Sequence, residues 1–344
     1  MKDVLSKLCL RENLTDTEAG VAMASIMDGE ATPAQVAAFL VALKMKGETA
    51  GELFGCATVM RQRAEKVKTS RTGLTDTCGT GGDGRGTFNI STAAALIAAG
   101  AGLPVAKHGN RSVSSKCGSA DVLEALGVKL DLTPGEMGAC LDEVGISFLY
   151  APVLHKAMKH AAGPRRDVGV RSVFNLLGPL TNPAGATRQL LGVYAAELAP
   201  VMANVLLLLG AEQALVVHGS DGSDELTLAG STMVCELRGG KVLCYDVVPE
   251  DLGLKRSAPD TLRGGGPDEN AALVLAVLQG QFGPHRDVSV LNAGAALYVG
   301  GLAANLADGI NLAREAIDSG AALAKLEALR RFTGGQSDAL ANCG

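Results

Sequence analysis

Tryptophan is absent from the sequence, and aromatic residues make up only 3% of its 344 positions. Glycine, in contrast, occurs 44 times, and hydrophobic residues reach 47%. This composition excludes wholesale disorder and predicts a core built mainly from alanine, valine and leucine. The length allows two domains or one large one.

A large excess of one charge is also absent, since the formal net charge is −5. A general nucleic-acid binder would carry a basic surface, so that class is disfavoured, although a local anion pocket stays possible. The longest apolar run, at 205–209, is far too short to span a bilayer, and the first residues do not read as a signal peptide. We therefore expect a cytoplasmic protein with neither a membrane nor a nucleic acid as partner.

The eight cysteines contain no pair at the spacing of a zinc site. A disulfide scaffold is unexpected in a chain of this length. We therefore expect reduced thiols throughout.

Periodicity divides the chain into a helical start and a longer alternating region. The first 68 residues predict helices only, with a capping box at 15–18 and an N-cap followed by proline at Thr32-Pro33. From Leu74 onward, short apolar runs alternate with helical patterns, which predicts crossover units and a mostly parallel central sheet. The fold class is therefore α/β, with a small all-helical N-terminal domain before a larger α/β domain. Strands are expected at 75–78, 104–106, 146–150, 190–194 and 214–218, an added hairpin at 234–237 and 242–245, and further helices from 268 onward.

Ligands of parallel sheets bind beyond the carboxyl ends of the strands, and a glycine-rich turn at 79–86 follows the first strand. Its glycines allow close backbone approach, and the following helix N-terminus favours an anion. Gly79, Gly81 and Gly84 formally satisfy a dinucleotide fingerprint. Asp83 would repel a pyrophosphate, however, and the expected ribose-binding acid is missing, so this alternative is weak.

Two polar runs are expected to face the same crevice. The run at 87–92 supplies small polar side chains, although helix capping alone would explain one of them. The second strand ends in Lys107-His108-Gly109-Asn110-Arg111 and continues into a serine-rich segment up to Ser119. An ordinary solvated loop is the alternative, but the strand-end position favours a phosphate or pyrophosphate loop.

Two further clusters complete the set. Asp224 and Glu225 follow the strand at 214–218 and suit Mg²⁺ beside a polyphosphate, with Asp83 tied to the hydration shell; a solvated acidic turn is the alternative. Arg165 or Arg166 could grip a planar carboxylate ahead of the rigid turn at 175–183. A pair of surface arginines explains this last cluster equally well.

Together these clusters resemble the anthranilate phosphoribosyltransferase family over essentially the whole chain. The matching runs are 79–83, 89–92, 107–111, 118–127, 175–183 and 224–225. Two positions depart from the family pattern, since Cys117 stands where serine is usual and Lys156 follows His155 where proline is common.

The resemblance implies a nucleoside phosphorylase/phosphoribosyltransferase-like fold with a helical domain at 1–70, joined by a later segment at about 165–184. The larger domain, 71–344, would bind 5-phosphoribosyl 1-pyrophosphate (PRPP), and homodimers would form through the helical domain. Mg²⁺ would be held by Ser91, Asp224 and Glu225. Anthranilate would be received by Gly79, Asn110, His155, Arg165 and Pro179. PRPP would be bound by Gly79, Gly82, Asp83, Thr87, Asn89, Ile90, Ser91, Thr92, Lys107, His108, Gly109, Asn110, Arg111, Ser112, Val113, Ser114, Ser115 and Ser119.

The implied reaction moves the phosphoribosyl group to the anthranilate amine, in tryptophan biosynthesis. A neutral aryl amine needs no strong base, so we expect neither a covalent enzyme nucleophile nor an essential general base. The nearest alternative is a pyrimidine nucleoside phosphorylase, which would use inorganic phosphate and would not need the acidic pair. A catalytically silent relative that binds nucleic acid and an NAD(P)-dependent enzyme rank below it.

Overall fold

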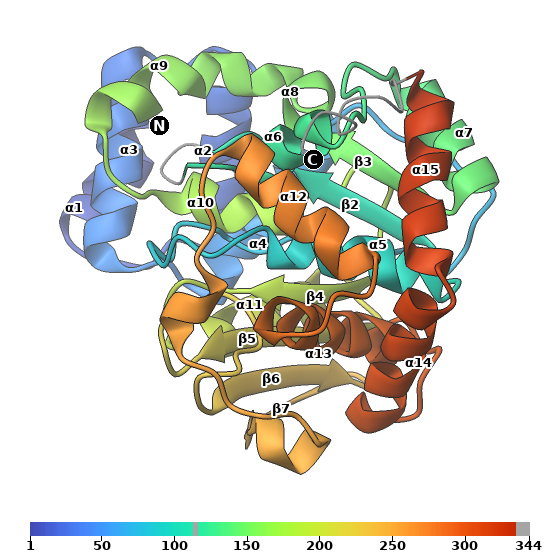
Figure 1. Ribbon diagram of the computed structural model, residues 1–344. Helices are drawn as coiled ribbons and strands as arrows, with labels where there is room; N and C mark the ends of the chain where they lie inside the picture. The colour runs from blue at the N-terminus through green and yellow to red at the C-terminus, as the bar shows by residue number, and fades with distance from the viewer. Residues whose placement is uncertain (113–115, 335–344) are drawn as a thin grey trace.

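The structure is a computed structural model that describes residues 1–112 and 116–334 (Figure 1). Its described strands form one sheet in the order β3-β2-β1-β4-β5-β6-β7. The pairs among β1 to β5 are parallel, and β6 and β7 are antiparallel, which confirms the mostly parallel sheet. The strands are β1 (Thr75–Asp76), β2 (Val105–Gly109), β3 (Ile146–Tyr150), β4 (Arg188–Gly192), β5 (Gln213–Gly219), β6 (Thr232–Arg238) and β7 (Lys241–Val247).

The predicted hairpin is β6 and β7. Gly239 and Gly240 join the two strands at φ angles of 57° and 73°, a conformation that favours glycine. Cys235 lies directly opposite Cys244 in this hairpin, and the two form a disulfide. The expectation of reduced thiols throughout is wrong for this pair. Antiparallel pairing brings the two side chains together although nine positions separate them, which spacing motifs do not reveal.

The N-terminal helices begin where the capping signals predict. Three of them carry a capping box, in which Thr15, Thr32 and Thr49 each accept the third backbone N–H of the helix. Their apolar faces, with Phe39 and Leu53 fully buried, pack into one core. The helices are α1 (Lys2–Cys9), α2 (Asp16–Met27), α3 (Pro33–Lys46) and α4 (Ala50–Arg63).

The remaining helices cover the two faces of the sheet and its strand ends. They are α5 (Ile90–Gly100), α6 (Ser119–Ala125), α7 (Pro134–Val144), α8 (Ala151–Leu154), α9 (Lys159–Val168), α10 (Val173–Leu177), α11 (Leu198–Leu208), α12 (Pro267–Leu278), α13 (Pro284–Val299), α14 (Leu306–Asp318) and α15 (Ala321–Thr333). None of the helices at 1–112 and 116–334 is long and apolar enough to cross a membrane.

Alternating side chains of the strands feed two different cores. Leu190, Leu215 and Val234 join the core that contains α5, α12 and α13. Their neighbours Leu191 and Val216 face the opposite way, into the core shared by α11 and the N-terminal helices. Figure 1 shows α9 lying beside α2 and α3, so a segment far along the chain packs on the N-terminal bundle.

Candidate active site

The glycine-rich turn between β1 and α5 lies against the end of β4. Thr80 donates its backbone N–H to the carbonyl of Gly192 at 2.8 Å, and its hydroxyl accepts the N–H of Tyr194 at 3.2 Å. Gly81 and Gly82 have φ angles of 63° and 77°, which L side chains rarely adopt. The turn therefore keeps its shape through glycine and through bonds to a neighbouring strand end.

The acidic pair predicted from the sequence meets this turn. The backbone N–H of Gly81 donates to Asp224 Oδ2 at 2.8 Å, across 143 positions of sequence. The β4 end is packed so closely here that a Cβ on Gly192 would overlap the carbonyl oxygen of Asp224. Two strand ends and the loop after β5 thus converge on one point, as expected for a parallel sheet.

The carboxylates at this point raise one another's pKa. Burial, and next the charge of Asp83, raise the pKa of Asp224, while burial and the charge of Asp224 raise the pKa of Glu225 well above its ordinary value. Asp83 Oδ2 is buried, and no described residue is its hydrogen-bond partner. Three clustered carboxylates with an unpartnered oxygen are the oxygen-rich donor set that suits a divalent cation such as Mg²⁺.

A buried asparagine, which sequence analysis missed, holds the acidic pair in place. Asn292 on α13 accepts the N–H of Leu226 at 3.0 Å and donates to the carbonyl of Leu226 at 2.9 Å. Both main-chain groups next to Glu225 are therefore fixed by one side chain. No local pattern around Asn292 could have indicated this long-range contact.

Lys107, in the middle of β2, lies at the N-terminus of α5. Its Nζ is within 3.2 Å of the carbonyl and of the hydroxyl of Thr77, and within 3.3 Å of Ser91 Oγ. The side chain is only 3% exposed, and its charge lowers the pKa of Glu225. The ammonium group is therefore held by neutral oxygens and remains available to an anion at the glycine turn.

The polar run at 87–92 divides into different environments. Thr87 forms a backbone bridge with Arg263, and Ile90 is buried in the core. Asn89 Oδ1 accepts from Asn270 Nδ2 at 2.9 Å and lies 3.3 Å from the thiol of Cys117. Thr92 Oγ1 is buried without a hydrogen-bond partner among the described residues.

The segment after β2 is described up to Ser112 and again from Lys116. His108 Nδ1 lies 3.1 Å from the carbonyl of Gly178, and the hydroxyl of Ser119 donates to the carbonyl of Asn110 at 3.3 Å. Arg111 is engaged by acidic side chains of α6. The predicted phosphate contacts at Val113, Ser114 and Ser115 lie outside the described residues.

The residues predicted for anthranilate are only partly brought together. The His108 and His155 rings lie 5.1 Å apart at their centres, close to the turn that contains Pro179. Burial, and next the charge of Lys66, lower the pKa of His155 to about 4, so this imidazole is neutral at pH 7. Arg165 lies on α9, with its guanidinium 5.9 Å from the Phe174 ring centre.

Arg171 is a further neighbour of the turn that the sequence did not single out. Its guanidinium donates to the carbonyl of Gly82 and lies 4.6 Å from the Tyr194 ring centre. It therefore links the segment before α10 to both the glycine turn and the end of β4. Three nearby arginines, at 165, 166 and 171, look alike in sequence, so only the fold distinguishes them.

Comparison with known families defines the class of this fold and site. Residues 2–64 match the "Glycosyl transferase family, helical bundle domain", and residues 71–323 match the "Glycosyl transferase family, a/b domain". The helical bundle and the α/β domain thus belong to the glycosyl transferase family.

Individual relatives narrow the class further. The chain is 54% identical to anthranilate phosphoribosyltransferase of Acetivibrio thermocellus over 333 residues, 97% of this chain and 96% of the relative. The crystal structure of the Thermus thermophilus enzyme is 47% identical with a TM-score of 0.91, covering 96% of this chain and 99% of that one. The Saccharomyces cerevisiae enzyme in complex with PRPP and Mg is 28% identical with a TM-score of 0.88, covering 96% and 97%. This chain belongs to the anthranilate phosphoribosyltransferase family.

Proposed function

We propose that this chain transfers the 5-phosphoribosyl group of PRPP to the amine of anthranilate, giving N-(5-phosphoribosyl)anthranilate and pyrophosphate in tryptophan biosynthesis. The observation that carries the proposal is the bond from Gly81 to Asp224. It joins a glycine-rich anion turn to a half-buried acidic pair, and both are needed to hold a metal-neutralised diphosphate. The solved complex of the yeast relative with PRPP and Mg supports the choice of donor and metal.

The donor would bind at the strand ends. Gly79, Gly82 and Asp83 with Thr87 would line the turn, and the helix N-terminus at 89–92 would face the same anion. The segment at 107–115 and Ser119 would cover the phosphates, with Lys107 as the cation nearest the turn. Ser91, Asp224 and Glu225 would hold Mg²⁺, which when bound supplies charge neutralisation for the diphosphate.

The residues of this chain would act mainly by positioning and electrostatics. Cleavage of the anomeric C–O bond leaves positive charge on the ribose and negative charge on pyrophosphate. Lys107 and the backbone N–H groups of the turn would stabilise the departing anion. Orienting the neutral amine opposite the departing pyrophosphate would lower the entropic part of the activation barrier. Neither a covalent nucleophile nor an essential base is then needed.

Anthranilate would enter beside the paired histidines. Gly79, Asn110, His155, Arg165 and Pro179 would receive it, with Arg165 placed to bind the carboxylate. A neutral His155 can border an aromatic ring without adding a charge to the path.

The test follows the loss of anthranilate fluorescence when PRPP is added. We expect loss with Mg²⁺ present and none after a chelator is added. Release of free base from thymidine or uridine under phosphate, without consumption of anthranilate, would support a nucleoside phosphorylase in its place.

Domain division and assembly are part of the proposal. We propose a helical domain of residues 1–70 with the segment 165–184, an α/β domain of residues 71–344, a homodimer formed through the helices, and a cytoplasmic location. Exposed apolar side chains on the first helices support the dimer, since Leu10 and Met45 are 71% and 70% exposed and Val21 is 59% exposed. Met45→Glu should shift the molecular mass measured by light scattering from dimer to monomer, whereas an unchanged mass would contradict this interface.

A further inference from the structure

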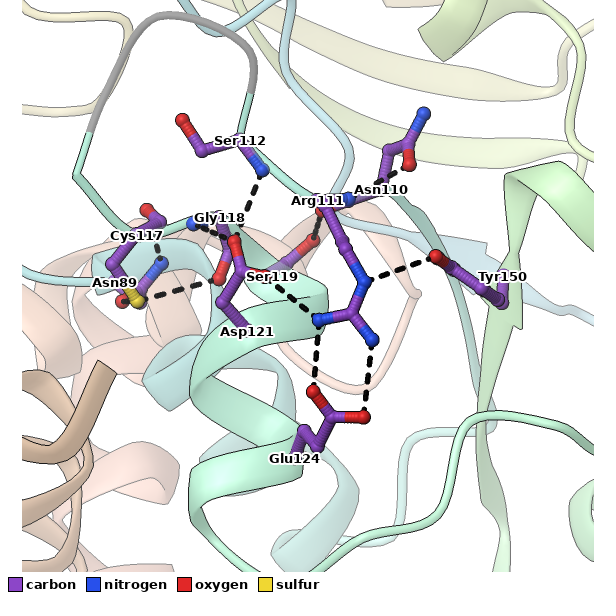
Figure 2. A network of polar contacts seen from close by, with 10 residues as sticks. All are labelled: Asn89, Asn110, Arg111, Ser112, Cys117, Gly118, Ser119, Asp121, Glu124 and Tyr150. Carbon is purple, nitrogen blue, oxygen red and sulfur yellow. Dashed lines mark hydrogen bonds and ion pairs between the residues drawn. The ribbon is translucent and has the colours of Figure 1, made fainter. Parts of the chain in front are cut away.

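The segment after β2 is closed at its base by one carboxylate. Asp121, in the first turn of α6, accepts the backbone N–H of Ser112 at 3.1 Å and of Gly118 at 2.8 Å with the same oxygen, Oδ2. The two amides belong to the two arms of the segment, as Figure 2 shows. We call residues 110–112 and 117–119 the neck.

The arms of the neck are in direct backbone contact. A Cβ on Gly118 would overlap the nitrogen of Ser112 and would lie 2.8 Å from the carbonyl carbon of Arg111, so only glycine fits there. The carbonyl of Asn110 accepts the N–H of Ala120 at 3.2 Å. The width of the neck is therefore fixed by close packing and by Asp121 together.

Arg111 completes the closure with its side chain. Its Nη1 contacts Asp121 Oδ1 at 3.0 Å and Glu124 at 2.8 Å, its Nη2 donates to Glu124 at 3.0 Å, and its Nε donates to the Tyr150 hydroxyl at 3.2 Å (Figure 2). Two carboxylates of α6 thus more than offset its single positive charge. In this arrangement little of the guanidinium is left for a substrate phosphate.

A second link ties the neck to the donor site. Asn89, at the start of α5, donates from Nδ2 to the carbonyl of Cys117 at 3.4 Å and lies close to the Cys117 thiol. Asn270 on α12 holds the Asn89 oxygen from the other side. Asn89 therefore connects the neck to the N-terminus of α5, which we propose faces PRPP.

We propose that Asp121 is a positioning residue that holds the neck in place within the proposed PRPP site. Arg111 acts through Asp121 and Glu124, and its guanidinium does not bind the phosphates. This inference rests on the proposed function, because it assigns a role within the PRPP site. Lys107 and Arg171 then remain as cations, among the described residues, that lie beside the proposed diphosphate site.

The first test compares Asp121→Ala with Glu136→Ala. Glu136 is a matched control, since it occupies the equivalent position of α7 and accepts the N–H of Thr133 at 2.7 Å, outside the site. We expect the KM for PRPP to rise about tenfold or more in Asp121→Ala, because the N–H groups of Ser112 and Gly118 lose their acceptor and the neck is no longer held together. The kcat should stay within about threefold, as expected when binding of ground state and transition state weakens equally.

The second test asks whether Glu124→Gln raises or lowers the KM for PRPP. If Arg111 works through the neck, loosening it should raise the KM for PRPP by about two- to fivefold, the range of an exposed ion pair. If Arg111 instead binds phosphate, its release from Glu124 should lower that KM or leave it unchanged. The latter result would overturn the proposal.

The outcomes separate this inference from the proposed function. Wild-type protein that consumes no anthranilate would remove the proposed function itself. An active wild type, with Asp121→Ala matching Glu136→Ala in the KM for PRPP, would overturn the positioning role alone. Equal losses of thermal stability in the two variants, with a raised KM only in Asp121→Ala, would support it.

Discussion

Two carboxylate clusters lie at the strand ends, and they are built on opposite principles. Asp224 and Glu225 are half-buried beside Asp83, with backbone N–H groups as donors, and no arginine or lysine at 1–112 or 116–334 forms an ion pair with them. Asp121 and Glu124 share an arginine and lie nearer the surface. In the first cluster the carboxylates raise one another's pKa, whereas in the second cluster an arginine offsets one of the two negative charges.

This difference in charge indicates which of the two clusters binds a cation. Burying unbalanced carboxylates costs free energy, so such a cluster persists where a bound cation restores the balance. Carboxylates that are paired with an arginine, as Asp121 and Glu124 are, serve the architecture of the neck. Removing charge should therefore have opposite effects on stability in the two regions.

The largest expected effect is the loss of activity when the acidic pair Asp224 and Glu225 is replaced. Asp224→Asn with Glu225→Gln should lower kcat/KM by about 10³-fold, because the proposed metal loses its ligands. The same double variant should unfold at least about 2 °C higher than wild type in metal-free buffer, since buried charge has been removed. Calorimetry and the fluorescence assay measure the two effects.

Glu250→Gln with Asp251→Asn is the control for that experiment, because these neighbouring acids are exposed and distant in sequence from the turn. The control should change neither quantity. A destabilised Asp224/Glu225 variant that keeps normal turnover would break the comparison between the two clusters.

Lys107→Met tests the cation of the site. The side chain is buried, and a methionine of similar length keeps its volume, although the charge of Lys107 that lowers the pKa of Asp76 and Glu225 is lost. Loss of the charge that would face the diphosphate should lower kcat/KM by about 10²-fold. Lys241→Met, at the exposed start of β7, is the control, and a fall in Lys107→Met of less than about threefold would contradict the assignment.

The smallest expected effect is on the pH dependence of stability, and it comes from the buried, neutral imidazole of His155. Because the pKa of His155 is lowered to about 4 by burial, the unfolded chain takes up a proton before the folded one when the pH falls below about 6.5. This histidine therefore contributes stability above pH 6.5 that is lost on acidification. The loss between pH 7 and pH 5 should be about 2 kcal/mol smaller in His155→Gln, measured by urea unfolding. Identical pH profiles would show that His155 titrates normally.

The sequence could predict where chemistry would lie, because strand ends follow from periodicity. The turn at 79–86 and the pair at 224–225 both follow predicted parallel strands, and the structure joins them through Gly81 and Asp224. The hairpin around Gly239-Gly240 was equally predictable from its turn residues.

Side-chain pairing across the fold could not be predicted in the same way. Asn292 and Leu226 are 66 positions apart, and Arg171 and Gly82 are 89 apart, so neither contact leaves a local pattern. The disulfide of Cys235 and Cys244 depends on strand register, which spacing rules for cysteine ignore. For Arg111, the residue type suggested a phosphate ligand, whereas the fold places it in ion pairs with Asp121 and Glu124.

The central claim is that the glycine turn and the acidic pair Asp224 and Glu225 form one metal-dependent diphosphate site. Isothermal titration of pyrophosphate into wild type and into the Asp224→Asn/Glu225→Gln variant, with and without Mg²⁺, tests it most directly. We expect wild type to bind pyrophosphate with Mg²⁺ and to lose binding without it, and the variant to bind weakly in both buffers. Equal binding by the two proteins, or binding by wild type that is indifferent to Mg²⁺, would contradict the account.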